Sequence, residues 1–402
     1  MQFLKTCPLP VFDSLENMET LPENPLLKYP EDFEKAWSFL KCYVGSVGTF
    51  NAYRREIERL LQWSWIVADK SLKNLKREDI EEFSRFCQKP PKSWIGVKKA
   101  PRFLGKKEHR IPNPEWRPFV TTVTKRAFKE GEKPDIKDFD FSKESLKETF
   151  AILSSFFNYL IQEDFLSINP VSLIRQKSKF IQTQQAPRRI RRLSQNQWQY
   201  VINTAKQMAI VEPHHERTLF ILSILYGMYL RISELAASQR WTPSMNHFFK
   251  DNDGNWWFTT VGKGNKRREI AVSDSVLEAL KRWRLSLNLS PFPTLGDASP
   301  LLPKIKGTGP ITHTNYIRGI VQKAFDCAVV QLKMDNHLED ADALMEATVH
   351  WLRHTGISDD VKTRPREHVR DDAGHSSSAI TDKYIDVELK ERHASAKSKT
   401  IF

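Results

Sequence analysis

Six side chains in the second half of this 402-residue chain could do chemistry together. Arginine holds anionic oxygens in a fixed fork geometry. Lysine and histidine can transfer protons, and a tyrosine hydroxyl can serve as a nucleophile. His350 and Arg353 are three residues apart, which places both on one face of a helix. The set, in chain order, is Arg231, Lys263, His350, Arg353, His375 and Tyr384.

Each of these residues, taken alone, also has an ordinary structural explanation. Arg231 could cap a helix or pair with Glu234, and Lys263 could be an exposed lysine in a turn. His350 could be a buried, hydrogen-bonded histidine, and Tyr384 a half-buried aromatic. His375, after Gly374, could cap a helix. The case for chemistry therefore depends on the six occurring together.

The short motifs around these residues resemble those of the tyrosine recombinases, also called the phage integrase family. The resemblance covers about residues 194–390 and consists of LRISEL, VGKGNKRREI, HWLRHTG, GHSSSAIT and DKY, in the family's order. Each motif alone is weak evidence, whereas the ordered set is specific. The helical first half is similar in character to the family's core-binding domain.

The resemblance implies a reaction and a role for each residue. A tyrosine recombinase cleaves and rejoins DNA through a covalent 3′-phosphotyrosyl intermediate, without ATP, metal or other cofactor. Tyr384 would be the nucleophile, and Arg231 and Arg353 would hold the phosphate oxygens. Lys263 would be the general acid, with Lys266 as the less favoured alternative. His350 and His375 would bind the phosphate or help to deprotonate the tyrosine.

Two positions depart from the family pattern, and one histidine pair stays unassigned. Tyr229 stands where the family usually has glycine, and Ala373 stands where it usually has leucine. Neither change removes a catalytic group. The pair His214-His215 lacks a matching carboxylate or cysteine cluster, so we expect no metal site.

The elements that must position these residues follow from the hydrophobic periodicity. We expect helices over 31–43, from Thr49 as N-cap, after Lys76, and from Ser142 to Asn169-Pro170. In the second half we expect a buried helix over 217–229, a hairpin over 256–272, and helices after Ser273 and from about 312 to 332. The fold class is mainly α with a small antiparallel β-sheet in the catalytic domain (α+β).

Composition divides the chain into segments. We predict an N-terminal arm (1–28), a helical core-binding domain (29–172) with a basic insertion around 89–140, a basic linker (173–193) and a catalytic domain with a C-terminal tail (194–402). The four cysteines lie far apart, which excludes a disulfide scaffold. We see neither a secretory signal nor a membrane span and expect a cytoplasmic, nucleoid-associated protein.

The formal net charge of +13 fits either a protein with a polyanionic partner or an ordinary basic protein, and charge alone does not decide between them. The family resemblance implies double-stranded DNA as the partner, gripped by both domains, with a homotetramer on paired sites and a monomer or dimer off DNA. A role in a mobile genetic element is favoured by the chain length and the insertion. The predicted DNA-contacting residues are Arg54, Arg55, Lys98, Lys99, Arg175, Lys177, Lys179, Arg188, Arg189, Arg191 and Arg192.

Two other functions stay open at this point. A type IB topoisomerase-like enzyme would relax DNA with the same chemistry, and residue order does not distinguish it from a recombinase. A DNA-binding module without catalysis is the second alternative. The presence of all six candidate residues argues against it.

Overall fold

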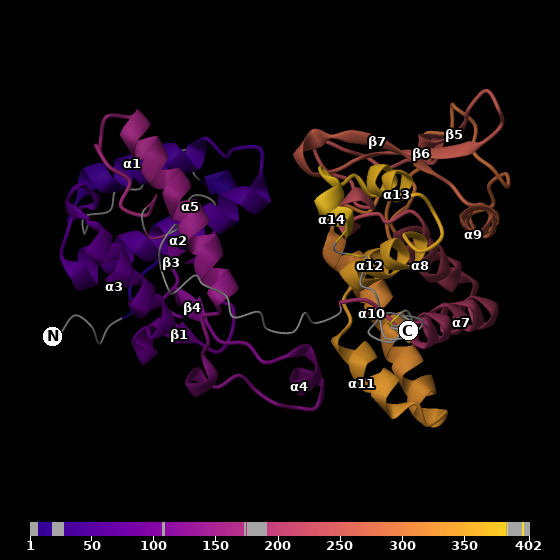
Figure 1. Cartoon of the computed structure of the whole chain (residues 1–402), viewed down its shortest axis with the longest axis horizontal. Coiled ribbons are helices and arrows are strands. Elements are labelled where there is room, and N and C mark those ends of the chain that lie inside the picture. The colour runs from indigo at the N-terminus through magenta and orange to yellow at the C-terminus, as the bar shows by residue number, and fades with distance from the viewer. Residues whose placement is uncertain are drawn as a thin grey trace, which may run out of the picture. The chain divides into compact units, whose positions relative to one another are not determined.

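The structure is a computed structural model that describes residues 7–17, 28–106, 109–172, 174, 191–382, 384 and 396–397. The chain forms two compact units, residues 1–188 and residues 189–402 (Figure 1). In the described ranges, every helix is too short or too polar to cross a bilayer.

Helices build the first unit around an aromatic core. They are α1 (Pro30–Lys41), α2 (Val47–Trp63), α3 (Arg77–Gln88) and α5 (Lys143–Gln162). Apolar side chains recur every three to four residues on each, so one face of each helix is buried. Phe39 of α1 contacts Phe156 of α5 with ring centroids 5.1 Å apart. Residues near the N-terminus join this core, because Phe12 is fully buried and stacks on Phe33.

Two expected helix boundaries in this unit are wrong. Ser46, not Thr49, is the N-cap of α2, and the two hydroxyls lie 2.8 Å apart in the first turn. Helix α5 ends at Gln162, well before Asn169-Pro170. The chain leaves the helix there because Asp164 adopts a left-handed backbone conformation with φ 53°.

The basic segment 89–140 contains small ordered pieces. Strand β1 (Ile95–Gly96) pairs in parallel with β4 (Phe119–Val120), and β2 (Phe103–Leu104) pairs antiparallel with β3 (Ile111–Pro112). The short helix α4 (Lys125–Lys129) follows. Trp94 and Phe119 are fully buried in the aromatic core. These two side chains therefore fix the segment to the helical unit.

The second unit is also mainly helical. Its helices are α7 (Gln195–Val211), α8 (Glu216–Gly227), α9 (Asp274–Ser286), α10 (Thr314–Met334), α11 (Leu338–Glu346), α12 (Val349–Asp360), α13 (Arg366–Ala373) and α14 (Ser378–Asp382). Helix α8 is the central one and is buried along nearly its whole length, as its apolar sequence predicts.

A three-stranded antiparallel sheet lies in the second unit, in the order β5-β6-β7 (Figure 1). The expected hairpin consists of β6 (Trp256–Val261) and β7 (Arg267–Ala271), while β5 (Phe248–Lys250) was not foreseen. The predicted fold class, mainly α with a small antiparallel sheet, is confirmed.

A close contact between α8 and α12 sets the position of the candidate site. A Cβ atom at Gly356 would collide with the backbone carbonyl of Tyr226. Only glycine allows α12 to approach the C-terminal end of α8 this closely. As a result, His350 and Arg353 on α12 face the segment that carries Arg231.

Candidate active site

A cavity of about 670 Å³ in the second unit brings most of the sequence-predicted residues together. Its lining includes Arg231, His350, Arg353, His375 and Tyr384, along with Gly262, Lys266 and Arg268. Lys263 belongs to the turn between β6 and β7, whose neighbours Gly262 and Lys266 line the same cavity. The side chain of Lys263 lies outside the described part of the structure. A larger cavity, lined by Trp198, Tyr226 and Arg282 among others, lies elsewhere.

A buried carboxylate holds Arg231. The Glu234 side chain is 1% exposed, and Arg231 donates to it from Nη1 at 3.0 Å. Arg268 of β7 donates to the same carboxylate from Nη1 and Nη2, each at 2.8 Å. Burial acts to raise the pKa of Glu234, but the hydrogen bonds and charge of Arg268 outweigh it and the pKa is lowered. Glu234 is therefore the anion that orients both guanidinium groups.

We expect the Glu234→Gln variant to lose about 3–5 kcal/mol of unfolding free energy. The guanidinium groups of Arg231 and Arg268 would then lie close together without the carboxylate that balances their charge. Urea unfolding followed by circular dichroism measures this loss. The matched control is Glu269→Gln, because the Glu269 side chain is 53% exposed and only 3.8 Å from Arg267. That control should cost less than about 1 kcal/mol. Equal losses in the two variants would contradict the assignment.

Arg353 is almost fully buried, with 2% exposure, and is held by backbone carbonyls. Its Nη1 donates to the carbonyl of Tyr229, and its Nη2 donates to the carbonyl of Ala373 at 2.6 Å. Nη2 also lies 3.3 Å from Nε2 of His375. Burial and the positive charge of Arg231 lower the pKa of Arg353. The guanidinium is therefore fixed in place before any substrate arrives.

Tyr229 explains the first departure from the family pattern. Its backbone is left-handed, with φ 50°, the conformation in which glycine has no penalty. Its ring is fully buried, and its hydroxyl bonds with the Asp360 carboxylate and accepts from Arg364 at 2.9 Å. The tyrosine thus tolerates the strained backbone because its side chain is anchored on the C-terminal end of α12.

His375 follows a left-handed glycine that ends α13. Gly374 has φ 65°, and this turn directs His375 back toward Arg353. The Nδ1 atom of His375 lies 2.9 Å from Oγ1 of Thr381. Burial and the charges of Arg353 and Arg231 lower the pKa of His375 to about 4. The imidazole is therefore neutral at pH 7.

The ring of Tyr384 contacts two imidazoles. It stacks on His375 with centroids 5.4 Å apart and on His354 with centroids 5.0 Å apart. His354 in turn makes an edge contact with His350 at 4.4 Å. Burial raises the pKa of Tyr384, against the lowering effect of Arg353 and Arg231. The hydroxyl is therefore protonated at pH 7 and needs a base to become a nucleophile.

His354 is the site residue that sequence analysis did not assign. It follows Arg353 directly and lies four residues after His350, so i,i+4 spacing on α12 was the available signal. Burial and the nearby His350 and Arg353 lower the pKa of His354 to about 4. That spacing predicts the contact with His350 but not the contact with Tyr384, which lies 30 positions later in the chain.

These lowered pKa values predict how stability depends on pH. Unfolded histidine titrates near 6.5, whereas His354 and His375 titrate at about 4 in the folded chain. Protons therefore bind the unfolded chain first, and stability should fall as the pH drops from about 6.5 toward 4. Urea unfolding at pH 7 and pH 5 measures this loss. The loss of unfolding free energy between pH 7 and pH 5 should be smaller in His354→Phe than in the parent. It should be unchanged in His313→Phe, which replaces an exposed histidine. The same loss in both variants would contradict the lowered pKa of His354.

The predicted DNA-contacting residues are only partly within the described ranges. Arg54 bonds with the carbonyl of Asp13 and donates to Asn51 at 2.8 Å, so its guanidinium has partners within the unit. Arg55 pairs with Glu56, and Lys98 pairs with Glu115 at 3.1 Å. Lys99 and Arg191 are exposed, and Arg192 is half-buried. Arg175, Lys177, Lys179, Arg188 and Arg189 lie outside the described residues.

The chain is similar in sequence to tyrosine recombinases of the XerC type. No family profile matches the chain. Tyrosine recombinase XerC of Thermodesulfovibrio yellowstonii is 25% identical over 260 residues, which cover 62% of this chain and 73% of the relative. Tyrosine recombinase XerC of Chlorobaculum parvum is 25% identical over 173 residues, covering 40% of this chain and 49% of the relative. The chain thus spans about half the length of that relative.

Solved structures share the fold. The XerH site-specific recombinase bound to palindromic difH substrate superposes with a TM-score of 0.55 at 15% identity, over 99% of this chain and 94% of that one. A lambda integrase dimer bound to a core site gives a TM-score of 0.50 at 13% identity, over 96% of this chain and 87% of that one. These relatives and structural neighbours are all tyrosine recombinases, which confirms the resemblance that the ordered motifs carry.

Proposed function

We propose that the protein is a site-specific DNA recombinase that cleaves and rejoins DNA through a 3′-phosphotyrosyl intermediate. The observation that carries the proposal is the position of Tyr384. Its ring stacks on His375 in the cavity that Arg231 and Arg353 also line. A nucleophile, two anion-binding groups and neutral bases within one cavity suit attack on a phosphodiester.

The two arginines would hold the phosphate. A phosphodiester under attack gains negative charge on its non-bridging oxygens, and preorganised donors stabilise that charge most effectively. Arg231 is held by Glu234 and Arg353 by two backbone carbonyls, so neither needs to reorganise when the charge develops. Arg231 is also partly exposed, at 29%, which leaves it accessible to DNA.

Proton transfers would complete the reaction. The Tyr384 oxygen forms a bond to phosphorus while the bond to the 5′-oxygen breaks, and a neutral imidazole accepts the phenolic proton. His375 is neutral at pH 7 and stacks on the tyrosine, which favours it for this task. Lys263, in the turn beside the cavity, would protonate the leaving 5′-oxygen as general acid. The phosphotyrosyl bond keeps the energy needed for rejoining, so the reverse step restores the DNA.

The partner in this proposal is double-stranded DNA. The net charge of +13 supports it, because neutralised phosphates dominate such affinities and make them salt-dependent. In the proposal the first unit is a core-binding domain with the basic insertion, and residues 173–193 are the linker that joins it to the catalytic domain. Four copies act on two paired sites of a mobile element, and the protein works at the nucleoid in the cytoplasm.

Covalent capture tests the proposed function. DNA flanking the gene supplies candidate sites, and a nick placed beside the scissile phosphate lets the released 5′ fragment diffuse away. The expected result is a protein–DNA adduct that survives denaturing electrophoresis and disappears on protease treatment. Strand exchange between two labelled sites then separates a recombinase from a topoisomerase-like enzyme, which would only relax supercoils. Tight DNA binding without an adduct on any flanking site would overturn the proposal in favour of a non-catalytic module.

A further inference from the structure

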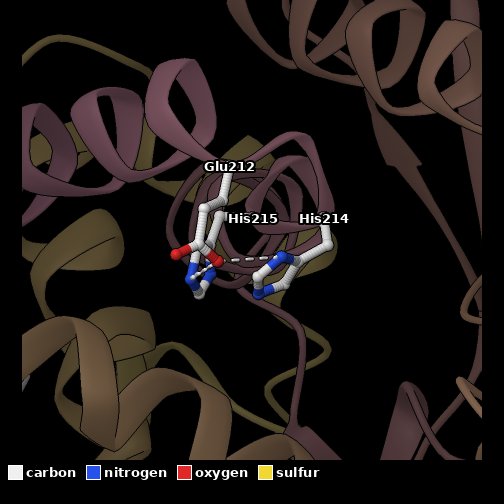
Figure 2. A group of neighbouring side chains, drawn as sticks. All are labelled: Glu212, His214 and His215. Atoms are coloured by element: carbon white, nitrogen blue, oxygen red, sulfur yellow. Dashed lines mark ion pairs between the residues drawn. The ribbon is translucent and has the colours of Figure 1, made fainter.

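A cluster of metal-binding side chains lies at the junction of α7 and α8, apart from the candidate active site. Glu212, His214 and His215 are brought together there, with one potential ligand atom from each within 4.8 Å of the others (Figure 2). The Glu212 carboxylate lies 3.2 Å from Nδ1 of His214 and 3.9 Å from Nε2 of His215. The expectation of no metal site rested on the lack of a carboxylate, and that premise is wrong.

We propose that Glu212, His214 and His215 form a binding site for a zinc-class divalent transition-metal ion. Two nitrogens and one carboxylate oxygen are a ligand set that zinc accepts, with water in the fourth position. Ligand atoms about 2.0–2.1 Å from a tetrahedral ion lie about 3.3 Å from one another. The separation of Glu212 and His214 already has this value, whereas His215, 3.9 Å from the carboxylate and within 4.8 Å of the His214 ligand atom, has to move closer to both.

A hydrogen bond behind His215 favours the ligating form of its ring. Nδ1 of His215 lies 3.1 Å from Oγ1 of Thr218, and the His215 side chain is 9% exposed. When Nδ1–H donates to the threonine, the lone pair is on Nε2, the nitrogen that lies 3.9 Å from the Glu212 carboxylate. In metal sites, a hydrogen bond from the ring nitrogen that does not ligate the metal fixes the tautomer and orientation of the histidine.

Lys323 of α10 competes with a metal ion for the same nitrogen. Its Nζ lies 3.5 Å from Nε2 of His215, and its side chain is exposed, so it can move aside. An ammonium group at this distance would repel a bound cation. Lys323 therefore weakens the site, and its removal should strengthen metal binding. No purely structural role for the cluster predicts that gain.

The position of the cluster separates it from catalysis. It precedes the first residue of α8, whereas Arg231 follows the last, and a 12-residue helix spans about 18 Å. A bound ion would fasten the end of α7 to the start of α8. The proposal of a metal site therefore does not depend on the proposed recombinase activity, and each can be tested without the other.

Zinc titration of the metal-free full-length protein, with a chromophoric chelator as competitor, tests the site. His214→Ala and Glu212→Gln are the main variants, because these side chains are 60% and 57% exposed and their loss should not disturb folding. Free cysteines and other histidines are also potential zinc ligands, so the decisive quantity is the difference in zinc binding from the parent. We expect one fewer tightly bound zinc ion, or at least about tenfold weaker binding, in both variants.

Two further variants complete the test. Lys323→Met should bind zinc several times more tightly than the parent, and His313→Ala, which removes an exposed histidine elsewhere, should match the parent. Cobalt(II) gives a second readout, since its visible absorption reports tetrahedral nitrogen and oxygen ligands and should be lost in His214→Ala. Equal zinc binding by the parent, His214→Ala and Glu212→Gln would overturn the proposal. Unchanged or weaker binding by Lys323→Met would also count against it.

Discussion

Tyr384→Phe should abolish the covalent protein–DNA adduct while leaving DNA affinity within about twofold of the parent. Phenylalanine keeps the ring that stacks on His375 and His354 and removes only the hydroxyl that would bond to phosphorus. Loss of a nucleophile costs far more than loss of a binding contact, so we expect at least a roughly 1000-fold decrease in cleavage rate. Denaturing electrophoresis of a nicked DNA site measures the adduct, and a gel-shift assay measures affinity.

Tyr316→Phe is the matched control for this experiment. Tyr316 lies on α10, is 39% exposed and does not line the active-site cavity. Its removal should leave the adduct yield as in the parent. If Tyr384→Phe captured as much DNA as the parent, another residue would be the nucleophile, and the stacking of Tyr384 would then be purely structural.

Arg231→Lys should reduce the cleavage rate by about 10²–10³-fold, equivalent to about 2.7–4 kcal/mol of transition-state stabilisation. Lysine keeps the positive charge but cannot donate to Glu234 and to phosphate oxygens in one planar geometry. DNA binding should change little, because the ground-state attraction depends on charge. Single-turnover cleavage at saturating protein isolates the chemical step from binding.

The control for the arginine experiment is Arg240→Lys, an exposed arginine in the same region of the chain. It should alter the cleavage rate less than about threefold, as exposed charges usually contribute little. A cleavage rate for Arg231→Lys close to that of the parent would mean that Arg231 contributes only charge. Arg353 would then carry the oriented contact with the phosphate alone.

Local sequence signals predicted most of the helices and the hairpin. Ser142 caps α5, with its hydroxyl accepting from the third residue of the helix, as such residues do. The buried helix α8 and the pairing of β6 with β7 also follow from apolar runs and a glycine-bearing turn. The family resemblance and the fold class are confirmed. The roles of the six residues stay predictions, although five of them line one cavity.

Contacts between distant segments were beyond the reach of sequence patterns. The local sequence suggested the pair between Arg231 and Glu234, but nothing in it marks Arg268, 34 positions later, as the third member of this ion network. The stacking of His354 on Tyr384 likewise requires α12 and the end of α14 to meet in space. The prediction of Thr49 as N-cap was wrong because two hydroxyl residues lie close together in the sequence. Ser46, three residues earlier, is the N-cap.

The strained turn at Tyr229 joins the two guanidinium groups mechanically. The carbonyl of Tyr229 accepts from Arg353, and Arg231 follows only two residues later in the chain. This short stretch of backbone therefore takes part in placing both cations, since Arg231 is attached to it and Arg353 is hydrogen-bonded to it. A substitution that changed the backbone conformation at position 229 would alter the surroundings of both guanidinium groups at once.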